Sequence, residues 1–339
     1  MSEATVAALQ IGTDPAGTRA TLSALLAHGA AIRAKSVDLL VLPEALLGGY
    51  PKGDRFGTQL GYRLPEGRAR FAEYAAQAIT VPGPETDTLA AFAADCRCDM
   101  VIGVIERCGA TLYCTALFFS SDNGLVAKHR KLVPTGTERL IWGQGDGSTM
   151  PVVESRAGRA AMAICWENHM PLFRTAMYGR GLDVWCAPTV DDRDIWHCSM
   201  RHIAHEGRCF VVSACQIMLT PAEIGRTVEG WPDDRPLIRG GSVIVGPLGD
   251  ILAGPLYGQP GLVTAKIDAA ALVGARYDFD PVGHYNRPDL FRLIVDDAAK
   301  DTVEYRSTAL DAPLVQRGPD EETAHWRSSK TRPHDSGTG

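Results

Sequence analysis

Short, unbroken apolar runs that stop at a reactive side chain restrict the fold of this chain more than any other feature. The run at 38–43 stops at Glu44, and the run at 160–164 stops at Cys165. An apolar run of strand length without polar alternation is typical of a strand covered on both faces, as in a parallel sheet between helices. Leucines and an isoleucine at helical spacing in residues 19–35 predict one such helix. The pattern therefore predicts an α/β fold.

Other segments continue this succession of strands and helices, and none of them divides the chain. Strand-like segments lie at 5–12, 100–106, 115–119, 124–128, 184–189, 209–215, 241–250 (a strand and a turn) and 261–268, with helical segments at 86–95 and 194–207. The polar segment 220–239 is expected to be a long loop. No internal repeat and no linker interrupts the body. We therefore expect one domain over residues 1–313, followed by a polar, mobile tail over 314–339.

The charge and the cysteines exclude several classes of protein. The net charge is -6 and basic residues are scattered, so neither nucleic acid nor an anionic membrane is an expected partner. The start of the chain lacks the basic and apolar segments of a signal peptide, and no apolar stretch is long enough to span a bilayer. The nine cysteines are expected to be reduced thiols in a cytoplasmic protein. Neither a metal site nor a bound cofactor is expected, because cysteines at zinc-ligand spacing and a phosphate-loop spacing are both missing from the sequence.

Three strand ends carry side chains that could form one catalytic set. Glu44 supplies a carboxylate, Lys131 an ammonium after the strand that begins at 124, and Cys165 a thiol. The carboxyl ends of parallel strands meet at one edge of a sheet, where a following helix can lower the pKa of a thiol. Each residue alone has a structural explanation, namely packing for the cysteine and solvated charge for the other two. Their joint occurrence in this order favours a shared site.

The motifs around these residues resemble those of the nitrilase superfamily. The matching segments are Leu-Pro-Glu at 42–44, His-Arg-Lys-Leu at 129–132 with Pro-Thr at 134–135, and Cys-Trp-Glu-Asn at 165–168. The resemblance covers nearly the whole chain and fails only in the tail. It implies a four-layer αββα sandwich and a catalytic triad made of Glu44, Lys131 and Cys165.

Further motifs resemble the branch of true nitrilases. They are Met-Pro-Leu at 170–172, Trp-Gly-Gln-Gly-Asp-Gly at 142–147, the segment 200–210 and Arg-Gly-Gly-Ser at 239–242. By this resemblance Glu138 is a second glutamate near the lysine, able to orient Lys131 or the attacking water. A structural ion pair with a neighbouring arginine is the alternative for Glu138. His169, where a tyrosine is common, and the segment 196–198 depart from the pattern and leave the substrate preference open.

The same residues suit the chemistry of nitrile hydrolysis. Glu44 would take the thiol proton of Cys165 as sulfur adds to the nitrile carbon, and water would convert the resulting thioimidate into acid and ammonia through a thioester. Lys131 and the backbone N–H of Trp166 would stabilise the tetrahedral intermediate. The pocket is expected to be lined by five further side chains, although aromatic residues fill cores more often than they bind ligands: Tyr50, Trp142, Trp166, Pro188 and Thr189.

Other functions stay open from the sequence. Amidases and carbamoylases of the superfamily use the same triad, and a cyanide-processing enzyme would be a narrower variant. From another class, the chain could be a catalytically idle assembly protein, because members of the superfamily form dimers that extend into spirals. The stretches 50–74 and 220–239 are where the resemblance places the contacts of such a homo-oligomer. The intact triad argues against idleness.

Overall fold

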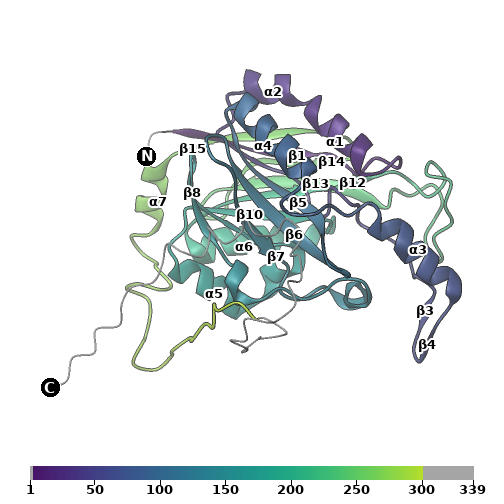
Figure 1. Ribbon diagram of the computed structural model, residues 1–339. Coiled ribbons are helices and arrows are strands. Elements are labelled where there is room, and N and C mark those ends of the chain that lie inside the picture. Colours follow the sequence, from purple (N-terminus) through teal and green to yellow (C-terminus); the bar gives the residue numbers. More distant parts are fainter. Residues whose placement is uncertain (1–2, 301–339) are drawn as a thin grey trace, which may run out of the picture. The chain divides into compact units, whose positions relative to one another are not determined.

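Residues 3–300 are the part of the chain that the structure, a computed structural model, describes (Figure 1). The domain end predicted at 313 and the polar tail at 314–339 lie outside these residues. Within this part the chain forms two large sheets and a short hairpin made of β3 (Thr58–Gln59) and β4 (Tyr62–Arg63). None of the helices in residues 3–300 is both long and apolar enough to cross a membrane.

The first sheet brings the ends of two distant strands to the same edge. Its order is β15 (Gly261–Ile267), β1 (Ala4–Gln10), β2 (Leu39–Val41), β5 (Asp99–Cys108), β6 (Thr111–Ser120) and β7 (Gly124–Arg130). β2 runs parallel to both β1 and β5. β6 is antiparallel to β5, and β7 is antiparallel to β6, so β7 again points in the direction of β2. The residues that follow β2 and β7 therefore lie at one edge, and β15 closes the other flank by pairing with β1 from Ala4 to Gln10.

The second sheet has a parallel centre with antiparallel margins. Its main order is β12 (Ile217–Met218), β13 (Ile238–Val245), β11 (Phe210–Cys215), β10 (Val184–Thr189), β9 (Gly158–Met162) and β8 (Val152–Ser155), and β14 (Ile251–Tyr257) also pairs with β13. β10 runs parallel to both β9 and β11. The residues that follow β9 and β10 therefore share an edge, as Glu44 and Lys131 do on the first sheet.

Three apolar clusters define four layers. The cluster between the sheets contains Val6, Val41 and Val101 from the first sheet, and Met162 and Val212 from the second. A second cluster packs the outer face of the first sheet against helices, and a third does so for the second sheet. The helices are α1 (Thr18–Leu26), α2 (Gly29–Ala34) and α4 (Pro84–Cys96) on the first sheet, and α5 (Pro171–Gly179) and α6 (Asp194–Gly207) on the second. This arrangement confirms the predicted αββα sandwich.

The structure differs from the sequence-based expectation in a few elements. The helix expected over 19–35 is two helices, α1 and α2, with the break just before Gly29, which packs closely against Phe92 of α4. Glycine has low helix propensity but lets two helices approach. The expectation missed the β3–β4 hairpin, β8, β14 and α7 (Ala269–Ala275). A helix is expected at the end of the loop-rich stretch 50–77, and the structure has α3 (Pro65–Ala75) there. β8 and β14 lack unbroken apolar runs because they are partly exposed strands at the margin of the second sheet.

Candidate active site

Glu44 lies just beyond β2, and both sheets hold its backbone. Its neighbour Pro43 accepts a hydrogen bond from Gly103 N of β5 at 3.0 Å, and Gln216 Nε2, which follows β11 of the second sheet, donates to Glu44 O at 2.6 Å. A Cβ at Gly103 would lie 2.5 Å from Glu44 Cα, so β5 needs a glycine at this position. The Glu44 side chain is fully buried.

Lys131 lies just beyond β7 and joins two carboxylates. Its Nζ donates to Glu44 Oε1 at 2.7 Å and to Glu138 Oε2 at 2.9 Å. The ammonium is also 5.6 Å from the centre of the Trp142 ring. A lysine is almost never fully buried unless it is paired, and here two carboxylates compensate its charge.

Cys165 lies at the start of a tight turn beyond β9, in a strained backbone conformation. Its φ is 50°, in the left-handed region that residues other than glycine rarely adopt. The turn is a short 3-10 helix, Cys165–His169, and Asn168 Nδ2 donates to Cys165 O at 2.7 Å. The thiol is buried, and Thr189 Oγ1 lies 3.3 Å from Sγ. Strain of this kind occurs where the surrounding structure holds a side chain in one position.

The side chains of Glu44, Lys131 and Cys165 share one electrostatic environment. Burial raises the pKa of Glu44, and the charge of Lys131, together with hydrogen bonding to Lys131 and to Cys165, only partly counteracts that rise. Burial on its own would lower the pKa of Lys131, but Glu44 and Cys165 raise it well above its usual value, so the amine stays charged. One oxygen of Glu44, Oε2, has no hydrogen-bond partner although it is buried. This oxygen is free to accept a proton.

The expectation of a lowered thiol pKa at Cys165 is wrong. Burial raises it, the Glu44 carboxylate raises it further, and Lys131 and the Thr189 hydroxyl lower it only partly. The sequence suggested a helix N-terminus behind the thiol, whereas the structure has a 3-10 turn there and α5 begins only at Pro171. Cys165 therefore rests as a thiol, and a reaction at its sulfur would need a base to remove the proton.

Glu138 and two aromatic side chains complete the inner part of the site. Tyr50 OH donates to Glu138 Oε1 at 2.8 Å, and the Tyr50 ring meets the Trp142 ring edge-on at 5.9 Å between centroids. Burial, followed by the charge of Glu138, raises the pKa of Tyr50, so its hydroxyl stays protonated. Glu138 forms its ion pair with Lys131 and not with the neighbouring Arg139, because Arg139 Nε donates its hydrogen bond to Pro134 O.

Trp166 and Pro188 take different places from the inner residues. Trp166 is 42% exposed, its Nε1 donates to Asp191 Oδ2 at 2.9 Å, and the guanidinium of Arg193 lies 5.1 Å from its ring centre. Trp166 therefore lies at the surface, outside the buried group of Glu44, Lys131 and Glu138. Pro188 is buried in β10 beside Thr189. It has no N–H to donate, and Thr189 supplies the polar contact to the thiol.

Sequence reasoning missed several residues that contact these groups. Cys114 of β6 has its Sγ 3.6 Å from Glu44 Oε1, and Gln216 holds the Glu44 backbone. The sequence analysis treated Glu167 only as part of a motif, yet its side chain is buried within the turn Cys165–His169. A signal for it exists, because a Glu three residues into a helical turn often accepts the backbone N–H before that turn. Glu138 does the same with Thr135 N at 2.7 Å.

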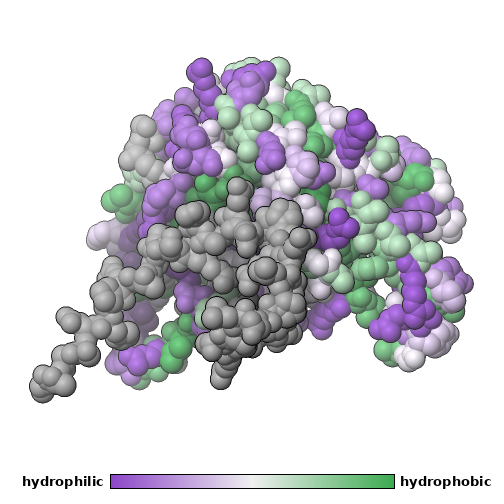
Figure 2. Space-filling view, in the orientation of Figure 1, coloured by the Kyte–Doolittle hydropathy of each residue, from purple (hydrophilic) through white to green (hydrophobic). Residues whose placement is uncertain are grey.

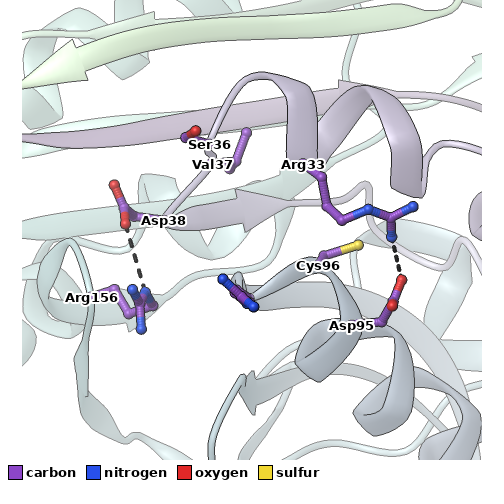
Figure 3. A pocket seen from close by; sticks show the side chains of 8 residues that line it. Arg33, Ser36, Val37, Asp38, Asp95, Cys96 and Arg156 are labelled. Carbon is purple, nitrogen blue, oxygen red and sulfur yellow. Dashed lines mark hydrogen bonds and ion pairs between the residues drawn. The ribbon is translucent and has the colours of Figure 1, made fainter.

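A surface pocket elsewhere on the first sheet is separate from this site (Figure 3). It lies where β2 and β5 begin, whereas Glu44 follows the end of β2. Ion pairs of Arg33 with Asp95 and of Arg156 with Asp38 line opposite sides of it, the latter at 3.6 Å. Among residues 3–300, no three His, Cys, Asp or Glu side chains gather closely enough to hold a metal ion.

Comparison with known proteins places the chain in a family. A family model described as carbon-nitrogen hydrolase matches residues 5–277. The chain belongs to this family. The carbon-nitrogen hydrolase of Helicobacter pylori has the same fold, with a TM-score of 0.68 and 17% identity over 86% of this chain and 97% of that one. The predicted fold and family are both confirmed.

Curated relatives of this carbon-nitrogen hydrolase are nitrilases. An aliphatic nitrilase of Sinorhizobium fredii is 49% identical over 91% of this chain and 100% of its own length. A bifunctional nitrilase/nitrile hydratase of Nicotiana tabacum is 48% identical over 91% of this chain and 89% of its own length. The resemblance to the nitrilase branch, stated from motifs alone, is thereby confirmed.

Proposed function

We propose that this protein is a nitrilase that hydrolyses an organic nitrile to a carboxylic acid and ammonia, with Glu44, Lys131 and Cys165 as its catalytic residues. The observation that carries the proposal is a buried lysine that bridges two buried carboxylates beside a buried thiol. Burying charged groups in this way costs stability, so their presence together indicates a functional site. The relatives named above support the choice of a nitrile as substrate.

In the first step Cys165 Sγ adds to the nitrile carbon. Glu44 takes the thiol proton on its unpartnered Oε2 and passes it to the nitrile nitrogen, which gives a covalent thioimidate. Because burial raises the pKa of Glu44, the carboxyl is a better proton acceptor than an exposed one. Lys131 remains charged and stabilises negative charge as it develops.

In the second step water adds to the thioimidate carbon with Glu44 as the base. Lys131 and the backbone N–H of Trp166 stabilise the tetrahedral intermediate, and Glu138 holds Lys131 in place from the other side. Ammonia leaves with the proton from Glu44, and a second water cleaves the thioester to release the acid and restore the thiol. If the tetrahedral intermediate instead expels the thiolate, the product is the amide.

A substrate panel tests the function. Aliphatic, aromatic and arylacetonitriles, the matching amides and cyanide would be incubated with the protein, and acid, amide and ammonia quantified. We expect acid and ammonia in equal amounts from at least one nitrile. Turnover of amides without nitriles would assign the protein to the amidases or carbamoylases, and turnover of cyanide alone would make it a cyanide-processing enzyme. No turnover of any compound would favour an idle assembly protein.

We also propose that the protein is a homo-oligomer whose dimers assemble into spirals through the stretches 50–74 and 220–239. The β3–β4 hairpin projects from one end of the fold (Figure 1), where hydrophobic side chains are visible beside hydrophilic ones (Figure 2). At this hairpin Leu60 is fully exposed and Tyr62 is half exposed. Burial against a second copy would remove this apolar surface from water.

Light scattering tests the assembly. We expect a mass well above one chain, and a smaller mass for Leu60→Asp, which places a charge in the proposed contact. A single-chain mass for the unchanged protein would refute the assembly.

We also propose a cytoplasmic location, because all nine cysteines are free thiols. A disulfide found by mass spectrometry in the protein isolated from its source would argue against that location.

A further inference from the structure

Glu167 is a buried carboxylate that the reaction scheme does not use, although it lies two residues after Cys165. Its Oε2 accepts a hydrogen bond from Ile164 N at 2.8 Å, and its Oε1 accepts one from Leu132 N at 2.6 Å. Ile164 immediately precedes Cys165, and Leu132 immediately follows Lys131. One carboxylate thus binds the backbone beside two of the proposed catalytic residues.

His129 of β7 holds this carboxylate from the other side. Its Nε2 lies 2.9 Å from Glu167 Oε2, and its Nδ1 contacts Thr149 O. Burial would lower the pKa of His129, but the charge of Glu167 and the hydrogen bond to it raise the pKa overall, so the two groups form an ion pair. The imidazole stacks on Phe173 of α5 at 5.7 Å. Both side chains of the pair are fully buried.

The pair connects segments that the sheets alone do not connect. Lys131 follows a strand of the first sheet, whereas Cys165 follows a strand of the second. Backbone hydrogen bonds within each sheet fix a residue relative to its own sheet only. The spacing of Lys131 from Cys165 therefore depends on contacts between the two sheets. Glu167, which follows β9, makes such contacts by accepting Leu132 N and by pairing with His129 of β7, while its bond with Ile164 N fixes the carboxylate to its own turn.

We propose that Glu167, oriented by His129, is a positioning residue that sets the distance between Lys131 Nζ and Cys165 Sγ. The proposal rests on the proposed function, because it concerns the same site. Effective catalysis needs reacting groups held close to their productive geometry, and a displacement of about 1 Å can cost about 100-fold in rate. Neither Glu167 nor His129 exchanges a proton with the substrate.

The first test replaces Glu167 by glutamine. The two backbone N–H groups bind different oxygens of Glu167, and glutamine keeps only one of these oxygens, so its NH2 group faces the other N–H, which loses its acceptor. We expect kcat for a nitrile to fall about 100-fold with little change in KM, because the substrate pocket is retained while alignment is lost. The rate at which iodoacetamide alkylates Cys165, followed by mass spectrometry, is expected to fall as well, and this readout needs no turnover.

The double variant Glu167→Gln/His129→Gln separates positioning from folding. It leaves no unpaired charge in the buried site, so stability is expected to recover relative to Glu167→Gln. A positioning role keeps kcat low in the double variant, since one of the two backbone N–H groups still lacks its acceptor. A return of kcat together with stability would overturn the proposal. His129→Gln alone keeps the Glu167 carboxylate and both backbone bonds, and we expect its kcat to fall less than tenfold.

A matched control makes the same chemical change away from the site. Asp183 precedes β10, accepts Arg159 N at 3.1 Å and pairs with Arg276 at 3.2 Å. Asp183→Asn is expected to lower stability while leaving kcat within about twofold. If folded Glu167→Gln keeps full kcat and full alkylation rate, the proposed positioning fails while the function stands. If the unchanged protein hydrolyses no nitrile, the function fails, and the alkylation rates alone still decide the positioning.

Discussion

Replacing Cys165 by alanine is expected to abolish nitrile hydrolysis, with a loss on the order of 10⁵- to 10⁶-fold in kcat. The covalent thioimidate needs the sulfur, and none of the groups that contact Cys165 can replace it as a nucleophile. The Thr189 hydroxyl lies 3.3 Å from Sγ, but an aliphatic hydroxyl is a far weaker acid than a thiol, so it cannot take over as the nucleophile. Acid and ammonia release, measured against the unchanged protein, gives the factor.

A second buried cysteine supplies the control for this loss. Cys209 is buried immediately before β11, in the cluster on the outer face of the second sheet. Cys209→Ala removes the same atom from the core and is expected to lower stability without lowering kcat. Full hydrolysis by a Cys165→Ala protein that is free of contaminating enzyme would rule out the covalent mechanism.

Replacing Lys131 by methionine is expected to have the largest effect on stability. The change removes the ammonium between Glu44 and Glu138 and leaves two buried carboxylates facing each other. Removing one partner of a buried ion pair costs about 3–5 kcal/mol of unfolding free energy. Activity is expected to fall by at least about 10³-fold, because the cation that stabilises the tetrahedral intermediate is gone. Denaturant unfolding and the nitrile assay measure the two effects.

The stability loss of Lys131→Met is expected to depend on pH. Burial already raises the pKa of Glu44 above 4.5, and without the ammonium it rises further. A carboxyl whose pKa is higher in the folded state than in the unfolded state favours folding when protonated, so its penalty appears as the pH rises. The variant should therefore lose less stability at about pH 5 than at about pH 8.

Lys128 provides the matched control for that variant. It lies three residues before Lys131, within β7, but it is one-third exposed, and Glu106, its partner at 2.8 Å, keeps Arg130 as a second partner. Lys128→Met is expected to cost about 1 kcal/mol or less with no loss of kcat. A similar stability loss in both variants would mean that Lys131 is not the compensating charge of the site.

The sequence predicts the positions of the candidate catalytic residues because each ends a recognisable apolar strand. Glu44, Lys131 and Cys165 follow β2, β7 and β9. That the two sheets face each other came only from the family resemblance, because strand patterns do not identify which sheet a strand joins.

Other features of the site depend on burial, which the sequence pattern does not quantify. The direction of the Cys165 pKa shift was wrong because it was inferred from a helix N-terminus, whereas desolvation has the larger effect. The contact of Glu167 with Leu132 joins residues far apart in the chain, so no local spacing could predict it. Glu138 could be placed near the lysine by resemblance, but only coordinates distinguish Lys131 from Arg139 as its partner.

The pairing of β15 with β1 determines how late in synthesis the first sheet can be completed. β1 leaves the ribosome long before its outer neighbour, which lies at residues 261–267. Until those residues are synthesised, one flank of β1 has unpaired backbone groups that can bind other extended chains. Glu44, Lys131 and Cys165 have all been synthesised by then. Folding of the site is therefore completed only by β15, which contributes no side chain to the chemistry. Truncation before residue 261 would therefore impair folding even though Glu44, Lys131 and Cys165 are all present.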